Sequence, residues 1–211
     1  ARPLFKSLLE GLAFAHAQGA LHRDLKTENV HVGTPENPRV TILDFGLVKF
    51  TDDERWGSGH KLTMMGSVFG TPAYMSPEQC TGAETDARSD VYAAGVILFE
   101  MLTGEWPFMK ETRLEMFKAQ LMEPPPNVSE YLTQPAPGLD EYIGRCLEKL
   151  PAKRFADAGE MLAALPDGTG PVTSPGVLPA VSPGASPGVS AAAANPDASI
   201  ILAVIAVVML S

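Results

Sequence analysis

Two short stretches decide how this chain folds: His22-Arg23-Asp24-Leu25-Lys26-Thr27-Glu28-Asn29, and Asp44-Phe45-Gly46, which begins fifteen positions after Asn29. Together they offer the aspartates Asp24 and Asp44, the amide of Asn29 and the lysine Lys26. Carboxylate and amide oxygens are ligands that Mg²⁺ accepts, and they commonly share the ion with the phosphates of a nucleotide. We therefore predict a phosphoryl-transfer site in which one Asp is left over for the substrate.

The residues between these stretches predict a hairpin that brings them together. Residues 30–32 and 40–43 have the composition of short strands, and the segment 33–38 between them is rich in turn residues. Such a hairpin returns Asp44 to the neighbourhood of Asn29.

Each residue of the predicted site has an expected role. Asn29 and Asp44 would coordinate Mg²⁺, and Lys26 would lie against the transferred phosphate. Asp24 would accept the hydrogen bond of the attacking hydroxyl group. Gly46 would let the chain turn sharply after the metal ligand, because glycine tolerates φ values that other residues do not.

These motifs resemble the catalytic loop and the metal loop of the eukaryotic-type (Hanks-type) protein kinases. Residues 70–78 (Gly-Thr-Pro-Ala-Tyr-Met-Ser-Pro-Glu) resemble the end of the kinase activation segment, and residues 86–95 (Asp-Ala-Arg-Ser-Asp-Val-Tyr-Ala-Ala-Gly) resemble the start of the long buried helix behind it. An isolated Asp-Phe-Gly is usually only a turn, and an isolated His-Arg-Asp is usually a surface cluster. Four such motifs in order are specific, and the bacterial serine/threonine kinases fit residues 2–165 best.

The resemblance assigns structural support to five further residues. It places His22 and Phe45 in a hydrophobic stack, and it pairs Glu78 with Arg154 in a buried ion pair. It has Asp90 hold the backbone of the catalytic loop. From its position before the apolar run, we also expect Asp90 to cap the first amides of the helix that follows.

The resemblance also implies regulation and a substrate class. Arg23 would hold a phosphorylated activation segment through charge-assisted hydrogen bonds, with Thr63 or Ser67 as the phosphorylated residue. The alternative is that the polar stretch at residues 51–67, which contains both hydroxyls, is only a flexible loop. Thr71 would bridge Asp24 and Lys26, which favours serine and threonine over tyrosine as acceptors.

Apolar spacing predicts a mainly helical chain. Helices are expected at residues 4–16, ended by Gly19, and at 91–102, ended by Gly104 and apolar nearly all round. Further helices are expected at 113–122, 139–150 and 157–165. With the hairpin, this predicts an α+β fold, mainly α, of the kind found in the large C-terminal lobe of a protein kinase, with the small lobe missing.

Composition divides the chain into three predicted segments: a kinase lobe at 1–165, a disordered linker at 166–199 rich in Pro, Gly, Ala and Ser, and a truncated transmembrane helix at 200–211. The alternative for the last segment is a hydrophobic tail or a partner-binding stub. No Lys or Arg lies between Arg154 and Ser211, so the positive-inside rule gives no orientation. The expected location is a cytoplasmic lobe on a single-pass inner-membrane protein.

Overall charge and cysteine content narrow the function classes. The formal net charge of −9, from 16 basic and 25 acidic residues, argues against nucleic acid as a partner. Cys80 and Cys146 form neither a disulfide framework nor a zinc spacing, which favours a reduced intracellular domain.

The expected activity is ATP-dependent phosphorylation of serine and threonine in protein substrates during signal transduction, with two Mg²⁺ ions, or Mn²⁺, as cofactors. A second copy of the chain is a further expected partner, for autophosphorylation in trans. The sequence contains no Gly-rich phosphate loop and no Val-Ala-Ile-Lys-like strand, so residues 1–211 alone are expected to be inactive. The alternatives are a catalytically silent scaffold and a small-molecule phosphotransferase.

Overall fold

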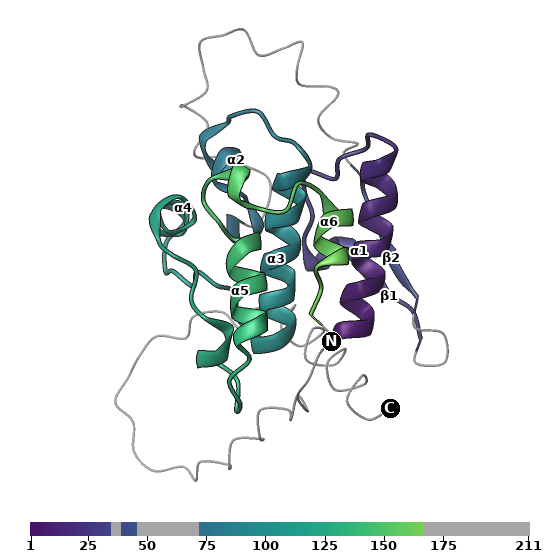
Figure 1. The fold of residues 1–211 in the computed structure, drawn as a ribbon. Coiled ribbons are helices and arrows are strands. Elements are labelled where there is room, and N and C mark those ends of the chain that lie inside the picture. Colours follow the sequence, from purple (N-terminus) through teal and green to yellow (C-terminus); the bar gives the residue numbers. More distant parts are fainter. Residues whose placement is uncertain (35–38, 46–71, 167–211) are drawn as a thin grey trace, which may run out of the picture.

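The computed structural model describes residues 1–34, 39–45 and 72–166 (Figure 1). The described part is mostly helical, with one two-stranded antiparallel sheet. In chain order the elements are α1 (Arg2–Ala17), the 3₁₀ turn η1 (Thr27–Asn29), β1 (Val30–Val32), β2 (Val40–Ile42), η2 (Pro72–Tyr74), α2 (Pro77–Thr81), α3 (Ala87–Thr103), α4 (Arg113–Met122), η3 (Val128–Glu130), α5 (Pro137–Cys146), η4 (Pro151–Lys153) and α6 (Ala158–Ala163).

Helix α3 forms the centre of the fold. Every residue from Ser89 to Glu100 is buried, and α5 and α6 pack against the helix (Figure 1). A helix surrounded on all sides needs an apolar surface all round, which explains the nearly continuous apolar run in its sequence. Gly104 ends the helix with a φ of 78°. The predicted buried helix at 91–102 is confirmed.

The predicted capping role of Asp90 is wrong, because α3 begins one turn earlier. Asp86 is the N-cap, and its carboxylate accepts the backbone N–H of Arg88 at 2.8 Å. Asp90 therefore lies inside the first turn, where the helix buries its carboxylate. This frees Asp90 to bind groups from another part of the chain.

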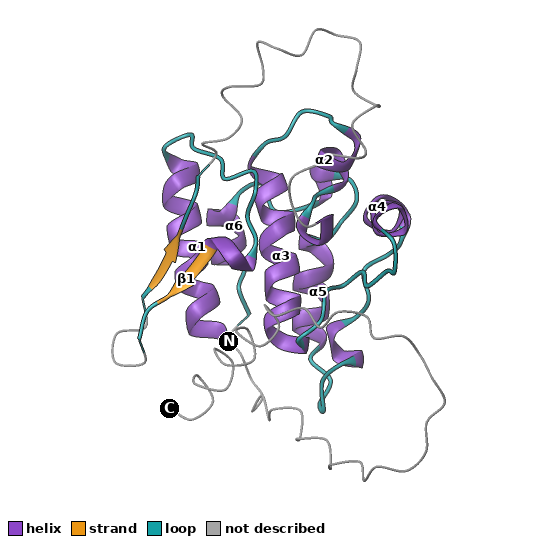
Figure 2. Cartoon of the chain, turned by 180° about the vertical axis from the view of Figure 1, so that it is seen from behind, coloured by secondary structure: helices purple, strands orange, loops and turns teal. Residues whose placement is uncertain are grey.

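Helix α1 forms the second layer. Phe5, Leu8, Leu9 and Leu12 bury one face of it, and α6 and β2 pack against the helix. Figure 2, seen from behind, shows the hairpin lying across α1. The predicted helix at 4–16 is confirmed, and Gly19 follows it with a φ of 76°.

The predicted hairpin is also confirmed. Strands β1 and β2 pair antiparallel, with Val30 opposite Ile42 and Val32 opposite Val40. The backbone N–H of Leu43 donates to the carbonyl of Asn29 at 2.8 Å. The residue that precedes Asp44 is thus bonded directly to the last residue of η1.

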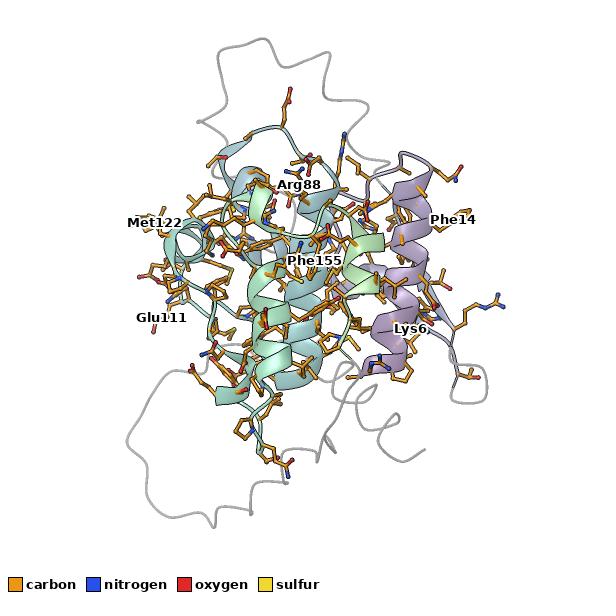
Figure 3. All side chains as sticks on the ribbon, viewed as in Figure 1. Lys6, Phe14, Arg88, Glu111, Met122 and Phe155 are labelled. Atoms are coloured by element: carbon orange, nitrogen blue, oxygen red, sulfur yellow. The ribbon has the colours of Figure 1, made fainter. Side chains whose placement is uncertain are left out.

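The two helices predicted after α4 are shorter than expected. α5 ends at Cys146 rather than at residue 150, and Leu147 is its C-cap. Leu150 is extended, as a residue before proline usually is. α6 begins at Ala158, since Asp157 is its N-cap and accepts the N–H of Glu160 at 2.9 Å. Figure 3 shows Phe155, between these helices, pointing into the core.

Within the described ranges, no helix is long and apolar enough to cross a bilayer. The predicted apolar segment at 200–211 and nearly all of the predicted linker, from residue 167 onward, lie outside those ranges.

The contact between α3 and α5 predicts a cost for one added methyl group. A Cβ on Gly95 would lie 2.5 Å from the Cβ of Cys146, which is too close for any rotamer change to relieve. The replacement Gly95→Ala should therefore push the helices apart and lower the free energy of unfolding by about 1 to 3 kcal/mol, as overpacking usually does. A thermal melt followed by circular dichroism would measure this.

The matched control is Gly144→Ala in α5, where nothing lies within 4 Å of the added Cβ. It should be neutral or stabilising by up to about 1 kcal/mol, because alanine favours helix more than glycine does. Equal effects at the two positions would contradict the steric explanation.

Candidate active site

Asp90 holds the loop that follows α1. Its Oδ2 accepts the backbone N–H of His22 and its Oδ1 accepts that of Arg23, each at 2.7 Å. Arg23 has a φ of 66°, which is unfavourable for any residue except glycine. Two charge-assisted hydrogen bonds from a buried carboxylate can hold the loop in this strained shape.

His16, to which the sequence analysis gave no role, fixes Asp90 in turn. Its Nδ1 accepts the backbone N–H of Ala158 at 3.2 Å, so its Nε2 carries the hydrogen and donates to Asp90 Oδ2 at 3.0 Å. The imidazole thus links α6 to α3 and the loop. A signal was present in the sequence, because His16 follows Leu12 by four positions on the apolar face of α1.

His22 joins the two motifs. Its Nε2 donates to the carbonyl of Leu43 at 2.8 Å, while its Nδ1 accepts the N–H of Asp24 at 3.3 Å. The imidazole is fully buried and lies 4.8 Å from the ring of Phe45. With both ring nitrogens engaged inside the protein, His22 is suited to positioning rather than to proton transfer.

Asp24, Lys26 and Asn29 are brought together by η1. The Asp24 side chain is 59% exposed, and its Oδ2 lies 3.1 Å from Lys26 Nζ. The Asn29 Nδ2 donates to the carbonyl of Asp24 at 2.8 Å. Since a carbonyl can only accept, this bond sets the orientation of the amide and leaves Asn29 Oδ1 available as a ligand.

Asp44 lies just after the hairpin, exposed, with a φ of 58°. In the described part of the chain, no group of three His, Cys, Asp or Glu side chains could hold a metal ion by itself. Asn29 and Asp44 carry an amide oxygen and a carboxylate, which are ligands that Mg²⁺ accepts when phosphates and water complete its shell.

Glu78 and Arg154 form a bidentate ion pair. Arg154 Nη1 and Nη2 donate to the two carboxylate oxygens at 2.8 and 2.9 Å, and Ser89 Oγ adds a bond at 2.6 Å. The Arg154 side chain is fully buried, and Nη1 also donates to the carbonyl of Arg88 at 3.0 Å. The pair ties α2 and the start of α3 to the turn before α6.

The pKa of Glu78 predicts how this pair responds to acid. Burial acts to raise the pKa, but the hydrogen bonds from Arg154 and Ser89 and the charge of Arg154 outweigh it and lower the pKa to about 2. The pair therefore stabilises the fold fully above about pH 4.5, the ordinary range of a glutamate, and loses this effect as the pH falls towards about 2. The loss of stability caused by Glu78→Gln should accordingly shrink as the pH falls from 6 to 2. Urea titrations at several pH values would measure it, and a pH-independent difference would contradict the prediction.

Arg23 Nε is buried and has no hydrogen-bond partner among the described residues. Gly46, Thr63, Ser67 and Thr71, which were predicted to form the turn after Asp44, to be phosphorylated, and to bridge Asp24 and Lys26, lie outside those residues. Their roles stay predictions.

The mostly helical fold is that of a protein kinase domain. A family model described as the protein kinase domain matches residues 1–164, so the chain belongs to the protein kinase family. Members of this family typically use ATP and Mg²⁺.

Several bacterial serine/threonine-protein kinases are similar to this chain. The chain is 41% identical over 166 residues to the serine/threonine-protein kinase pkn3 of Myxococcus xanthus, with 77% of this chain and 30% of that protein covered. It is 36% identical to PknB of Mycolicibacterium smegmatis (74% and 24% covered) and 36% identical to PknL of Mycobacterium tuberculosis (77% and 39% covered). The chain thus spans about a quarter to two fifths of the length of these relatives.

Proposed function

We propose that the protein transfers the γ-phosphoryl group of ATP to serine and threonine hydroxyls of other proteins in signal transduction. The observation that carries this proposal is the geometry of residues 24–29, in which an exposed Asp24 lies beside Lys26 and Asn29 Oδ1 is left available as a ligand. The similarity to named serine/threonine kinases supports the same conclusion.

In this proposal each residue has one task. Asp24 accepts the proton of the attacking hydroxyl. The oxygen of that hydroxyl bonds to the γ-phosphorus, and the bond between this phosphorus and the bridging oxygen of ADP breaks. Lys26 lies against the transferred phosphoryl group, and Asn29 with Asp44 would hold one or two Mg²⁺ ions, or Mn²⁺. The metal, when bound, neutralises charge that develops on the phosphate oxygens.

Two alternatives remain in other classes. A silent scaffold would have no chemical need for Asp24, Asn29 and Asp44 together. A small-molecule phosphotransferase would use similar ligands, but the segment 72–78, held to Arg154 through Glu78, favours a surface that docks peptides.

The test is an assay of the whole protein with Mg²⁺, ATP and peptide libraries that carry Ser, Thr or Tyr acceptors, run beside an aminoglycoside. Phosphorylation of Ser and Thr peptides is the expected result. Phosphorylation of the aminoglycoside alone would favour the small-molecule reading, and no phosphorylation of either would favour the scaffold.

We also propose that phosphorylation of Thr63 or Ser67 activates the enzyme. The buried Arg23 Nε, which no described residue satisfies, supports an anionic partner for this side chain. Phosphopeptide mass spectrometry of the active protein should find a phosphate on one of these hydroxyls, and a fully active but unmodified protein would contradict the idea.

The remaining proposals rest on the sequence alone. They are the ATP-binding small lobe outside residues 1–211, the linker at 166–199, membrane attachment through residues 200–211 with the kinase lobe in the cytoplasm, and pairing of two copies for autophosphorylation in trans.

A further inference from the structure

Thr27 lies at the start of η1, between Lys26 and Asn29, and none of the roles above involves it. Its Oγ1 lies 2.8 Å from the hydroxyl of Tyr74 in η2, 47 residues further along the chain. Tyr74 in turn donates to Glu100 Oε2 in α3 at 2.7 Å. A hydrogen-bonded chain therefore runs from the catalytic loop, through the segment that follows Thr71, into the central helix.

The end of this hydrogen-bonded series that lies at α3 is buried. Tyr74 and Glu100 are each 4% exposed. Trp106 Nε1 lies 3.1 Å from both the Tyr74 hydroxyl and Glu100 Oε1, and the two rings meet edge to face. Both oxygens of the buried carboxylate thus have a donor.

The backbone of η2 is anchored as well. Gln120 of α4 donates through its Nε2 to the carbonyls of Pro72 and Ala73, at 3.2 and 2.6 Å. Gln120 itself is fully buried. The two residues before Tyr74 are thus held by α4, and the Tyr74 hydroxyl is held by α3, so Tyr74 can serve as a fixed point for a neighbouring loop.

The hydroxyl of Thr27 connects the loop to this fixed point. The Tyr74 hydroxyl gives its single hydrogen to Glu100 Oε2, so Thr27 must donate its own hydrogen to Tyr74. Thr27 also lies 3.4 Å from a carboxylate oxygen of Glu28, but this longer contact cannot compete with the bond at 2.8 Å. Valine, which matches threonine in shape, would leave this bond unmade.

We propose that Thr27 is a positioning residue that holds η1, and with it Asn29 and Asp24, against the segment 72–78 through Tyr74 and Glu100. The inference rests on the proposed kinase function, because it concerns how that site is held in place. Asp90 and Gln79 hold the residues before η1, through bonds to the backbone of residues 22 and 23, so Thr27 supplies the anchor on the other side of Asp24.

The test compares Thr27→Val, Thr27→Ser and the control Thr41→Val in the whole protein. Thr41 lies exposed on β2, where a β-branched residue is equally suited to the strand. Thr27→Val should lower kcat for a peptide substrate about 10-fold with little change in KM. A misplaced catalytic loop reduces the stabilisation of the transition state more than it reduces the affinity for the substrate. Thr27→Ser, which keeps the hydroxyl, should restore kcat, and Thr41→Val should leave it unchanged.

A second readout does not depend on activity. Hydrogen exchange followed by mass spectrometry should show faster exchange at residues 26–30 in Thr27→Val and unaltered exchange in Thr27→Ser. Global unfolding is not expected, because Thr27→Val leaves Tyr74 and Trp106 as donors to Glu100. Adding Thr27→Val to Tyr74→Phe should change kcat less than 2-fold further, since the partner is already gone.

Wild-type kcat together with wild-type exchange in Thr27→Val would overturn the inference. So would full additivity of the two replacements. If the unaltered protein phosphorylates no peptide, the proposed function fails instead, and the exchange data still decide whether Thr27 anchors η1.

Discussion

Replacement of Asp24 by asparagine is expected to lower kcat for a Ser/Thr peptide by about 10² to 10⁴-fold, the usual contribution of a positioned general base. Asparagine preserves the size of the side chain but cannot take up the proton of the attacking hydroxyl. Asp24 is 59% exposed, and among the described residues its carboxylate has one close charged partner, Lys26, so the change should leave the fold intact. Steady-state kinetics with radiolabelled ATP would measure the loss.

The control for this prediction is Glu141→Gln, which neutralises an exposed carboxylate on α5. It should leave kcat unchanged. The two variants and the unaltered protein should also melt within a few degrees of one another. Retention of more than about a tenth of the activity in Asp24→Asn would remove Asp24 from the proposed role.

Replacement of Arg154 by alanine is expected to give the largest loss of stability, roughly 3 to 5 kcal/mol. The change leaves the carboxylate of Glu78 in a mostly buried position with Ser89 as its remaining side-chain donor. It also removes the donor that satisfies the carbonyls of Glu148 and Lys149. Denaturant unfolding at neutral pH would measure the change in free energy.

Two further variants distinguish the possible causes of this loss of stability. Lys6→Ala breaks an exposed pair with Glu10, at 3.7 Å, and should cost less than about 1 kcal/mol. Arg154→Met combined with Glu78→Leu removes both buried charges and should recover most of the loss, because apolar residues can replace a buried ion pair with little penalty. A double variant as unstable as Arg154→Ala would show that packing, not the stranded charge, causes the effect.

The predictions that succeeded rest on short-range patterns. Strand-like composition and turn residues predicted the hairpin, and the apolar run predicted α3, because both signals lie in neighbouring residues. The wrong capping role for Asp90 also came from a short-range pattern. Two aspartates, Asp86 and Asp90, stand near the start of α3, and only the position of the first turn shows which of them is the cap.

The helix boundary near residue 150 shows the same limit. Apolar spacing continued past Cys146, but the chain leaves the helix before Pro151. Pro151 accounts for the extended backbone of Leu150 alone, and no proline stands between Cys146 and Leu150. Periodicity alone therefore overestimated α5 by four residues at its end.

The sequence by itself determined the protein family, the order of the motifs and the identity of the residues that carry the proposed chemistry, because these depend on residue types at fixed short spacings. The tertiary structure alone decided how those residues are held. Asp90 meets the catalytic loop across 67 and 68 positions, and His16 meets Ala158 across 142. Thr27 meets Tyr74 across 47 positions. No local pattern encodes such pairings, since they arise only when packing of the apolar faces of α1, α3 and α6 brings distant polar groups to the same buried place, where each must find a partner.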